Sequence, residues 1–315
     1  MTDPGGVSAR RIQAHWLFAL SLMLCAGCAG TAVKSLSQAR LEAISHNQRG
    51  VQQELRGDRD EALAEFSEAL RLHGSIENLD GMTVARINMA RTHRLRGDLR
   101  SARSVIDPAL ALLPEPSDLA PELFFENAKI YLAAGDLVAA KDWSLRSAAL
   151  EKGGELGRRL NLVGTVLLRG GSAQEAREQV ERALKVNRDR GMAVEEANSL
   201  RLLGEIHLGQ GRNAEAIHCF NAALLLDKDL GLGKKIASDL RGLGAAASKN
   251  DDLAGAVAYY RRAVAVSLSG GDAGAAAEAT ARLAELYRKA GEPLPASKLE
   301  EQRAKPVQEG EKRQR

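Results

Sequence analysis

Six histidines and three cysteines are the residues of this chain best suited to chemistry. Catalysis by Cys219 needs a base beside it, and His218 is only its sequence neighbour. Adjacent helical residues diverge by about 100°, so this pair is also poorly placed to hold one metal ion. His93 and His207 lie far apart in the sequence and share no ligand. We interpret these two as core or groove-edge residues and Cys219 as a small buried hydrophobe.

A glycine-lysine stretch and several acidic doublets are the remaining candidates. Gly231-Leu-Gly-Lys-Lys235 lacks the spacing of a phosphate-binding loop and the Ser or Thr that follows its lysine. The doublets Glu195-Glu196 and Glu300-Glu301 are sequence neighbours, which is typical of a solvated helix face rather than of a facing acid pair. The sequence therefore predicts a protein that is not an enzyme, with no metal and no cofactor.

The first residues are typical of an export signal. Arg10 and Arg11 precede an apolar run, Trp16 to Leu24, and small residues follow as Cys25-Ala-Gly-Cys28. The ending Ala26-Gly-Cys28 resembles the lipobox of bacterial lipoproteins, although Cys25 stands where that family usually has leucine. The resemblance implies that residues 1–27 are a signal peptide, that the chain is cut before Cys28, and that lipid is attached to Cys28.

Two other interpretations fit the same segment. Trp16 to Val33 carries no charge over 18 residues, enough for an uncleaved membrane helix, and a plain cleaved signal is the second alternative.

In lipoproteins, aspartate after the cysteine retains the protein at the inner membrane. Ala29 stands there, so the resemblance implies the periplasmic face of the outer membrane. Lipidation of Cys28 and removal of Cys25 would leave Cys219 without a disulfide partner.

Composition favours a helical body. The 315 residues are 44% hydrophobic and only 3% aromatic, which suits helices packed through Ala, Leu and Val better than a β-sandwich. Charged residues make up 27% with a net charge of +3, so no general polyanion-binding signature is present and no nucleic-acid partner is expected. We interpret the basic end of the chain, residues 304–315, as a polar disordered tail.

One pattern recurs seven times at steps of 36–40 residues. Each copy has an anchor residue, glycine or alanine seven residues before it, and alanine five residues after it. Such a period indicates a solenoid built from one supersecondary unit. The anchors are Gly57, Gly97, Gly135, Gly171, Gly211, Asp251 and Gly291.

One copy, Leu200 to Leu226, shows the unit as helix, tight turn and helix. Helical spacing of apolar residues stops at Gly209-Gln-Gly211, where glycine can adopt the left-handed conformation that ends a helix. A second apolar stripe then runs to the polar Asp227. Small residues such as Gly204 are expected where the paired helices approach closely, and the larger residue nine after the anchor, here Phe220, is expected to fill the gap between units.

Gly204, Ala216, Phe220 and Ala223 together resemble the tetratricopeptide repeat, and the same columns recur in other copies. The resemblance implies an all-α, right-handed superhelical solenoid of antiparallel helix pairs, about seven repeats of 36–40 residues over 38–303, after a linker at 28–37. The period exceeds the usual 34 residues. We attribute the extra polar residues, such as Asp189-Arg-Gly191, to lengthened second helices plus longer connections.

In a tetratricopeptide-like stack, the first helices line the concave surface. The residues ten and six before each anchor are expected to face that groove, and their arginines suit a partner segment with acidic character. Ordinary solvated positions are the alternative. The candidate partner-binding residues are Arg91, Phe125, Lys129, Asn161, Asn198, Arg201, Glu205 and Arg241.

The sequence thus predicts a membrane-anchored periplasmic scaffold that binds a protein or peptide segment, as an assembly adaptor for a cell-envelope machine. Two alternatives remain open. One is a glycan-binding module, or a module associated with a peptidoglycan enzyme. The other is a regulator held by an uncleaved N-terminal helix.

Overall fold

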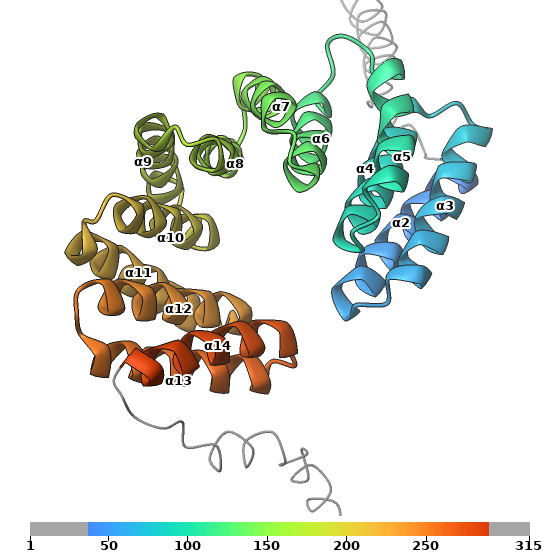
Figure 1. Ribbon diagram of the computed structural model, residues 1–315. Coiled ribbons are helices and arrows are strands. Elements are labelled where there is room, and N and C mark those ends of the chain that lie inside the picture. Colours follow the sequence, from blue (N-terminus) through green and yellow to red (C-terminus); the bar gives the residue numbers. More distant parts are fainter. Residues whose placement is uncertain (1–36, 290–315) are drawn as a thin grey trace, which may run out of the picture.

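The computed structural model describes residues 37–289, and in this part the chain is entirely helical apart from its connections. Six antiparallel helix pairs and the first helix of a seventh unit follow one another along an arc, with the first helix of each pair on the inner side (Figure 1). The helices are α2 (Gln38–Arg56), α3 (Arg59–Ser75), α4 (Leu79–Leu95), α5 (Leu99–Leu112), α6 (Ala120–Ala134), α7 (Leu137–Leu150), α8 (Leu156–Arg169), α9 (Ala173–Asp189), α10 (Ala193–Gly209), α11 (Asn213–Asp229), α12 (Gly233–Lys249), α13 (Leu253–Ser269) and α14 (Ala273–Lys289).

This arrangement confirms the predicted solenoid of repeated helix pairs. The signal peptide, Cys28, the linker up to residue 36, the last anchor Gly291 and the tail lie outside the described residues. Between residues 37 and 289, no helix is both long enough and apolar enough to cross a membrane. The alternative of an uncleaved helix at 16–33 also concerns residues outside this part of the chain.

The anchor residues turn the chain from the first helix of a unit into the second. Gly211 has φ 75°, and the next amide, of Arg212, donates to the carbonyl of His207 at 2.9 Å, which closes the helix end. Asp251 takes the same place with φ 59°, a conformation that Asp tolerates better than most side chains. The predicted turns therefore form where the sequence placed them.

The connections between units differ from the expectation in length. The second helices are lengthened, as expected, and α11 continues past Asp227 to Asp229. The connections after α9, α11 and α13 are only three residues long, however, so the prediction of longer connections there was wrong. Glycine explains the short turn: Gly191 has φ 66°, and the following amide, of Met192, donates to the Asn187 carbonyl at 2.8 Å.

Close packing at the small positions sets the spacing of each pair. A Cβ on Gly204 would lie 2.8 Å from Cε1 of Phe220, and a Cβ on Gly50 would lie 2.5 Å from Cε1 of Phe66. Phe220 also reaches the next unit, because a Cβ on Gly242 would lie 2.6 Å from the same ring. The large residue therefore fills space both within its own pair and between units.

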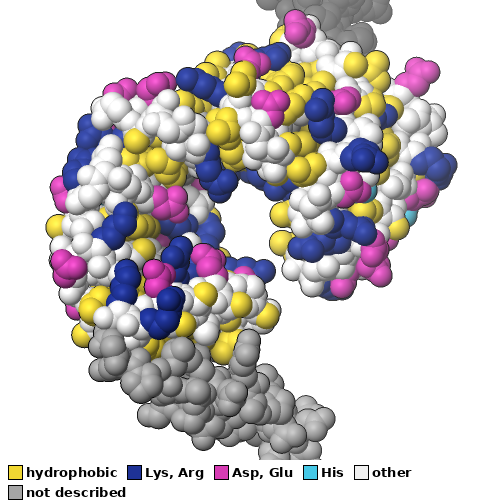
Figure 2. Space-filling model, in the orientation of Figure 1, with side chains coloured by type: hydrophobic (Ala, Val, Ile, Leu, Met, Phe, Trp, Pro, Cys, Tyr) yellow, Lys and Arg dark blue, Asp and Glu magenta, His cyan; other side chains and the backbone are white. Residues whose placement is uncertain are grey.

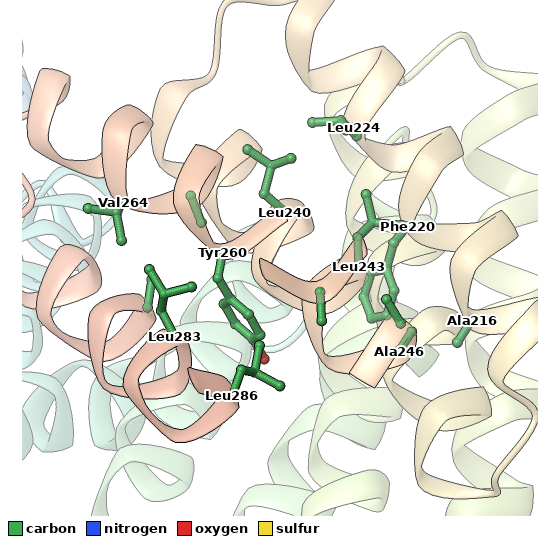
Figure 3. Packing of buried hydrophobic residues seen from close by; sticks show 14 of the residues in the cluster. Ala216, Phe220, Leu224, Leu240, Leu243, Ala246, Tyr260, Val264, Leu283 and Leu286 are labelled. Carbon is green, nitrogen blue, oxygen red and sulfur yellow. The ribbon is translucent and has the colours of Figure 1, made fainter. Parts of the chain in front are cut away.

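The apolar core runs along the stack as a series of clusters rather than as one centre. In the last three units, Phe220 lies beside Leu243 and Ala246 of the following pair, and Tyr260 is directed toward Leu286 of α14 (Figure 3). Burial of this kind between neighbouring units is the main source of stability in a solenoid. It also holds the first helices side by side, so that their inner faces form one continuous surface.

Candidate functional site

A cavity of about 500 Å³ lies on the concave face between α6, α8 and α10. Four of its lining residues, Arg158, Asn161, Thr165 and Arg169, stand thirteen, ten, six and two residues before the anchor Gly171. These positions define the inward stripe of a first helix. The cavity brings together six of the eight predicted partner-binding residues, which are Phe125, Lys129, Asn161, Asn198, Arg201 and Glu205.

The other two predicted residues lie on flanking helices. Arg91 of α4 is paired with Glu122 at 3.1 Å, and Arg241 of α12 is paired with Glu278 at 2.6 Å. Neither lines the cavity. Both guanidinium groups are about a quarter exposed, so they extend the basic character of the concave face beyond the cavity itself.

Arg201 does not present a free guanidinium group, contrary to the expectation that it would pair with a partner's carboxylate. It bridges two buried carboxylates, Asp227 of α11 and Asp239 of α12, and its Nε lies 2.7 Å from Asp239 Oδ1. Burial raises the pKa of Asp239 to about 7; Arg201 opposes this shift and the neighbouring Asp227 adds to it. Arg201 therefore joins the fifth unit to the sixth, and its charge is largely compensated within the protein.

The two asparagines are committed to internal hydrogen bonds. Asn161 donates from Nδ2 to the Glu195 carbonyl at 3.1 Å and accepts from the Ser199 hydroxyl at 2.8 Å. Asn198 Oδ1 accepts from Arg201 at 3.0 Å and from Lys235 Nζ at 2.7 Å. These bonds tie α8 to α10 and α10 to α12, so the asparagines shape the cavity floor.

Lys129 and Phe125 stand at the N-terminal end of the cavity. Lys129 Nζ lies 3.3 Å from Glu126 Oε2 and 5.2 Å from the centre of the Phe125 ring. Burial lowers the pKa of Lys129, while Glu126 acts in the opposite direction. Arg158 and Arg159 pack over the same ring at 4.4 and 4.6 Å, so three cations contact the cavity's aromatic side chain.

A network of ion pairs surrounds the end of the cavity that Lys129 and Phe125 form. Glu122 accepts from Arg91 of α4 at 3.1 Å, and from Arg158 and Arg159 of α8 at 2.5 and 2.6 Å. Burial by itself would raise the pKa of Glu122, but the three arginines together hold it below its usual value. One carboxylate of α6 thus joins first helices of three successive units. Glu126, whose side chain is fully buried, accepts from Arg94 of α4 at 2.5 Å as well.

Glu205 and Arg169 face the open part of the cavity. Burial raises the pKa of Glu205, although Arg201 and Arg169 lower it. Glu205 is nevertheless an exposed residue, so it sits in a recess that water still reaches. Within the described residues, Arg169 makes no ion pair shorter than 4.0 Å, which leaves its charge available to a partner.

Sequence reasoning missed Arg158, Arg169 and Lys235. The first two follow from the helical period, because they lie three residues before Asn161 and four after Thr165 on the same face. Lys235, in the stretch first considered as a phosphate loop, lies in the first turn of α12 and donates to Asn198 of α10, in the preceding unit. Only the stacking of α10 on α12 reveals that contact.

The structure places Cys219, His93 and His207 among packed side chains. Burial raises the pKa of the Cys219 thiol and lowers the pKa of both His93 and His207. The two histidines belong to α4 and α10, in different units. Across residues 37–289, no three His, Cys, Asp or Glu side chains are grouped so that they could hold a metal ion.

A second, larger cavity of about 870 Å³ lies beside α6 on the other side of the Glu122 network. The proline-containing connection between α5 and α6, Leu113 to Leu119, forms one wall, and the end of α7 forms another. Its lining is mixed in charge, with the cations Arg146, Lys152 and Arg159 and the carboxylates Glu115, Asp118, Glu122 and Glu151. It therefore has no excess of cations, whereas the concave cavity is lined by four cations and two carboxylates.

The fold and this face define the class of protein: a helical-repeat solenoid with a recessed, mainly basic concave surface. The Tetratricopeptide repeat family matches residues 155–229 and, in a second overlapping window, 195–268. These windows run from just before α8 to the end of α13 and contain most of the cavity. Together with the solved structures described next, the match supports a tetratricopeptide-repeat protein.

Several solved structures share the fold. One, from work on the functional characterisation of pilF of Pseudomonas aeruginosa, is 16% identical with a TM-score of 0.55, covering 78% of this chain and 100% of that one. A Rap protein complexed with Competence and Sporulation Factor is 14% identical, with a TM-score of 0.61 and coverage of 83% and 74%.

A signal-transduction ATPase with a tetratricopeptide-repeat sensor, from Pyrococcus horikoshii, is 14% identical with a TM-score of 0.63. The match covers 80% of this chain and 39% of that one. Identities this low concern the fold alone. Among proteins of curated function, none matches the sequence.

Proposed function

We propose that this protein is a membrane-anchored scaffold whose concave groove binds an acidic segment of a partner protein. One observation carries the proposal: the inward stripes of α6, α8 and α10 converge on a recess where Arg169 makes no ion pair within the described residues. Lys129 and Arg158 also line this recess, although each already contacts a carboxylate of α6. Carboxylates pair well with arginine, and a recess excludes part of the competing water. The groove is thus suited to binding.

The relatives support this kind of function. Tetratricopeptide repeats serve as protein-interaction modules, and the Rap neighbour is complexed with a factor of its own. The concave surface of a solenoid offers a long contact area without further insertions. The partner of this chain is accordingly expected to be a protein or peptide segment.

Attachment to the periplasmic face of the outer membrane belongs to the same proposal. Its support is the order of residues at the start of the chain: two arginines, an apolar run and Ala26-Gly-Cys28. An envelope-facing scaffold with a basic groove would serve as an assembly adaptor for a cell-envelope machine. Acyl chains on Cys28 would anchor it firmly, because each buried CH₂ contributes about 0.8 kcal/mol.

Two measurements test these parts separately. A photo-crosslinking residue at Thr165, inside the cavity, is expected to capture a protein partner in intact cells. The same residue at Leu225, exposed on α11, is the matched control. Capture at Leu225 but not at Thr165 would place the contact on the convex side and refute the groove.

The anchor is tested with a labelled fatty acid. Incorporation into the wild type, and its loss in Cys28→Ser, is the expected result. A labelled Cys28→Ser variant, or a mature chain that keeps residues 1–27, would contradict lipid attachment at Cys28. A pull-down with purified peptidoglycan tests the alternative of a glycan-binding module. This protein is expected not to bind to it.

A further inference from the structure

The concave face changes character along the arc. The cavity defines the inward positions of each unit as thirteen, ten, six and two residues before the anchor, and the same rule applies to the first two units. There, six of the eight inward positions are apolar. They are Ile44, Val51 and Leu55 on α2, and Val84, Ile87 and Leu95 on α4.

Part of this N-terminal stripe is strongly exposed. The exposed fraction is 76% for Leu55, 45% for Leu95 and 36% for Ile44. Thr92 of α4 donates to Glu54 of α2 at 2.7 Å, which joins the ends of the two helices that carry Leu55 and Leu95. These exposed side chains are available to an apolar part of a partner.

The same positions are basic further along. Units four to six carry five cations and one anion there, although the net charge of the whole chain is only +3. The cations are Arg158, Arg169, Arg201, Arg241 and Lys249, and the anion is Glu205. Three of these cations are ion-paired within the protein, whereas Arg169 and Lys249 make no ion pair within the described residues. Figure 2 shows both regions in one view, with hydrophobic side chains at the inner edge of the N-terminal arm and Lys and Arg around the inner rim of the middle.

We infer that the groove recognises a two-part segment, with apolar residues bound by α2 and α4 and acidic residues bound by α8 to α12. The inference rests on the proposed function and adds the chemistry, order and spacing of the partner. Charge complementarity selects the acidic part, and continuity of the inward stripe places the apolar part on the same path. A purely acidic segment would leave Leu55 and Leu95 uncovered.

The spacing follows from helix packing. Adjacent packed helices lie about 10 Å apart, so α4 and α8, separated by α6, are about 20 Å apart. An extended chain advances about 3.3 Å per residue, so about six residues separate the apolar and acidic parts. The Phe125, Lys129 and Glu122 region of α6 lies beneath this stretch.

Fluorescent peptides test the inference directly. One peptide joins a leucine-rich block to a glutamate block through about six Gly and Ser residues, in either order, and another carries the glutamate block alone. The two-part peptide is expected to bind at least about tenfold more tightly, because the second contact is intramolecular once the first has formed. Raised salt should weaken the glutamate contribution more than the leucine contribution.

Two double variants separate the two parts. Leu55→Ser with Leu95→Ser should reduce the two-part peptide to the affinity of the glutamate block, and should leave that block's own affinity unchanged. Arg169→Ser with Lys249→Ser should weaken both peptides. Matched controls away from the groove are Leu225→Ser and Lys185→Ser, on exposed positions of α11 and α9, and circular dichroism checks that every variant is folded.

The outcomes distinguish the proposal of a groove for an acidic segment from the inference of a two-part segment. Loss of binding in Arg169→Ser/Lys249→Ser, with no effect of Leu55→Ser/Leu95→Ser, would overturn the two-part inference and leave the acidic groove standing. Glutamate peptides that do not bind, or that bind equally to all variants, would overturn both. An equal loss in Leu225→Ser would show that the apolar contribution is not specific to the groove.

Discussion

Gly204→Ala is expected to destabilise the protein, because Gly204 packs directly against the ring of Phe220. In Gly204→Ala, the new Cβ would lie 2.8 Å from Cε1 and 2.9 Å from Cδ1 and Cζ of the ring. Carbon atoms prefer a separation of about 3.5–4.0 Å, so the ring must move by more than half an ångström. It has little room, because the backbone at Gly242 confines it from the next unit.

The expected change in the free energy of unfolding of Gly204→Ala is the difference between two opposing effects. Overpacking a tight core costs about 1–3 kcal/mol, and the confinement of Phe220 from two helices favours the upper half of that range. Alanine regains about 1 kcal/mol of helix propensity over glycine. The net expectation is a loss of about 1–2 kcal/mol in the free energy of unfolding. Gly204→Leu, with a larger side chain, should cost more.

Urea unfolding of four variants tests this expectation: Gly204→Ala, Phe220→Ile, the double variant that combines them, and Gly209→Ala. Gly209→Ala is the control in the same helix, since its Cβ would meet nothing within 4 Å, and it should be neutral or slightly stabilising. Gly204→Ala combined with Phe220→Ile reproduces the pair that Ala90 and Ile106 form in the second unit. The double variant should lose less stability than the sum of the single losses.

A Gly204→Ala protein as stable as the wild type would show that the ring can withdraw. The helix spacing would then not depend on this glycine.

The remaining predictions concern the turn and the buried charges. Gly211→Val should cost about 1–2 kcal/mol, because φ is 75° there, whereas Gly211→Asn should cost less, as Asp251 occupies the equivalent place; thermal melting compares them. Arg201→Met should lower the free energy of unfolding, measured in urea, by about 3–5 kcal/mol, because it leaves Asp227 and Asp239 buried without their cation. The control Arg169→Ser, at an exposed position, should change the free energy of unfolding by no more than about 0.5 kcal/mol. Asp239 has a folded pKa of about 7 against an ordinary 3.8, so the folded state keeps a proton that the unfolded state has lost. The resulting stability is present at low pH and is lost as pH rises toward 7, and urea unfolding at pH 5 and pH 8 should show this loss in the wild type and not in Asp239→Asn.

The elements of the fold were predictable because their signals are local. Anchor glycines, the small column at Gly204 and the apolar stripes all act within one helix pair, so a single repeat contains the information. Repetition then reinforces each assignment. The length of the connections was misjudged because polar residues such as Asp189 and Asp229 extend the helices, and nothing in their composition separates a helix end from a loop.

The site was predictable only in outline. The inward stripe placed Lys129, Asn161 and Glu205 in one recess, since the helical period determines which residues share a face. The state of Arg201 could not be foreseen, because its two partners come from different helices, 26 and 38 residues further along the chain. Which carboxylates approach a given arginine depends on how successive units stack.

The bridging by Glu122 has a consequence for how the solenoid unfolds. In a stack where each unit touches only its neighbours, stability is a sum of unit terms and pairwise interface terms. Glu122 of the third unit binds Arg91 of the second together with Arg158 and Arg159 of the fourth. Opening either interface leaves a half-buried carboxylate with fewer cations. Units two to four should therefore behave as a single cooperative block, with fraying confined to the ends of the arc.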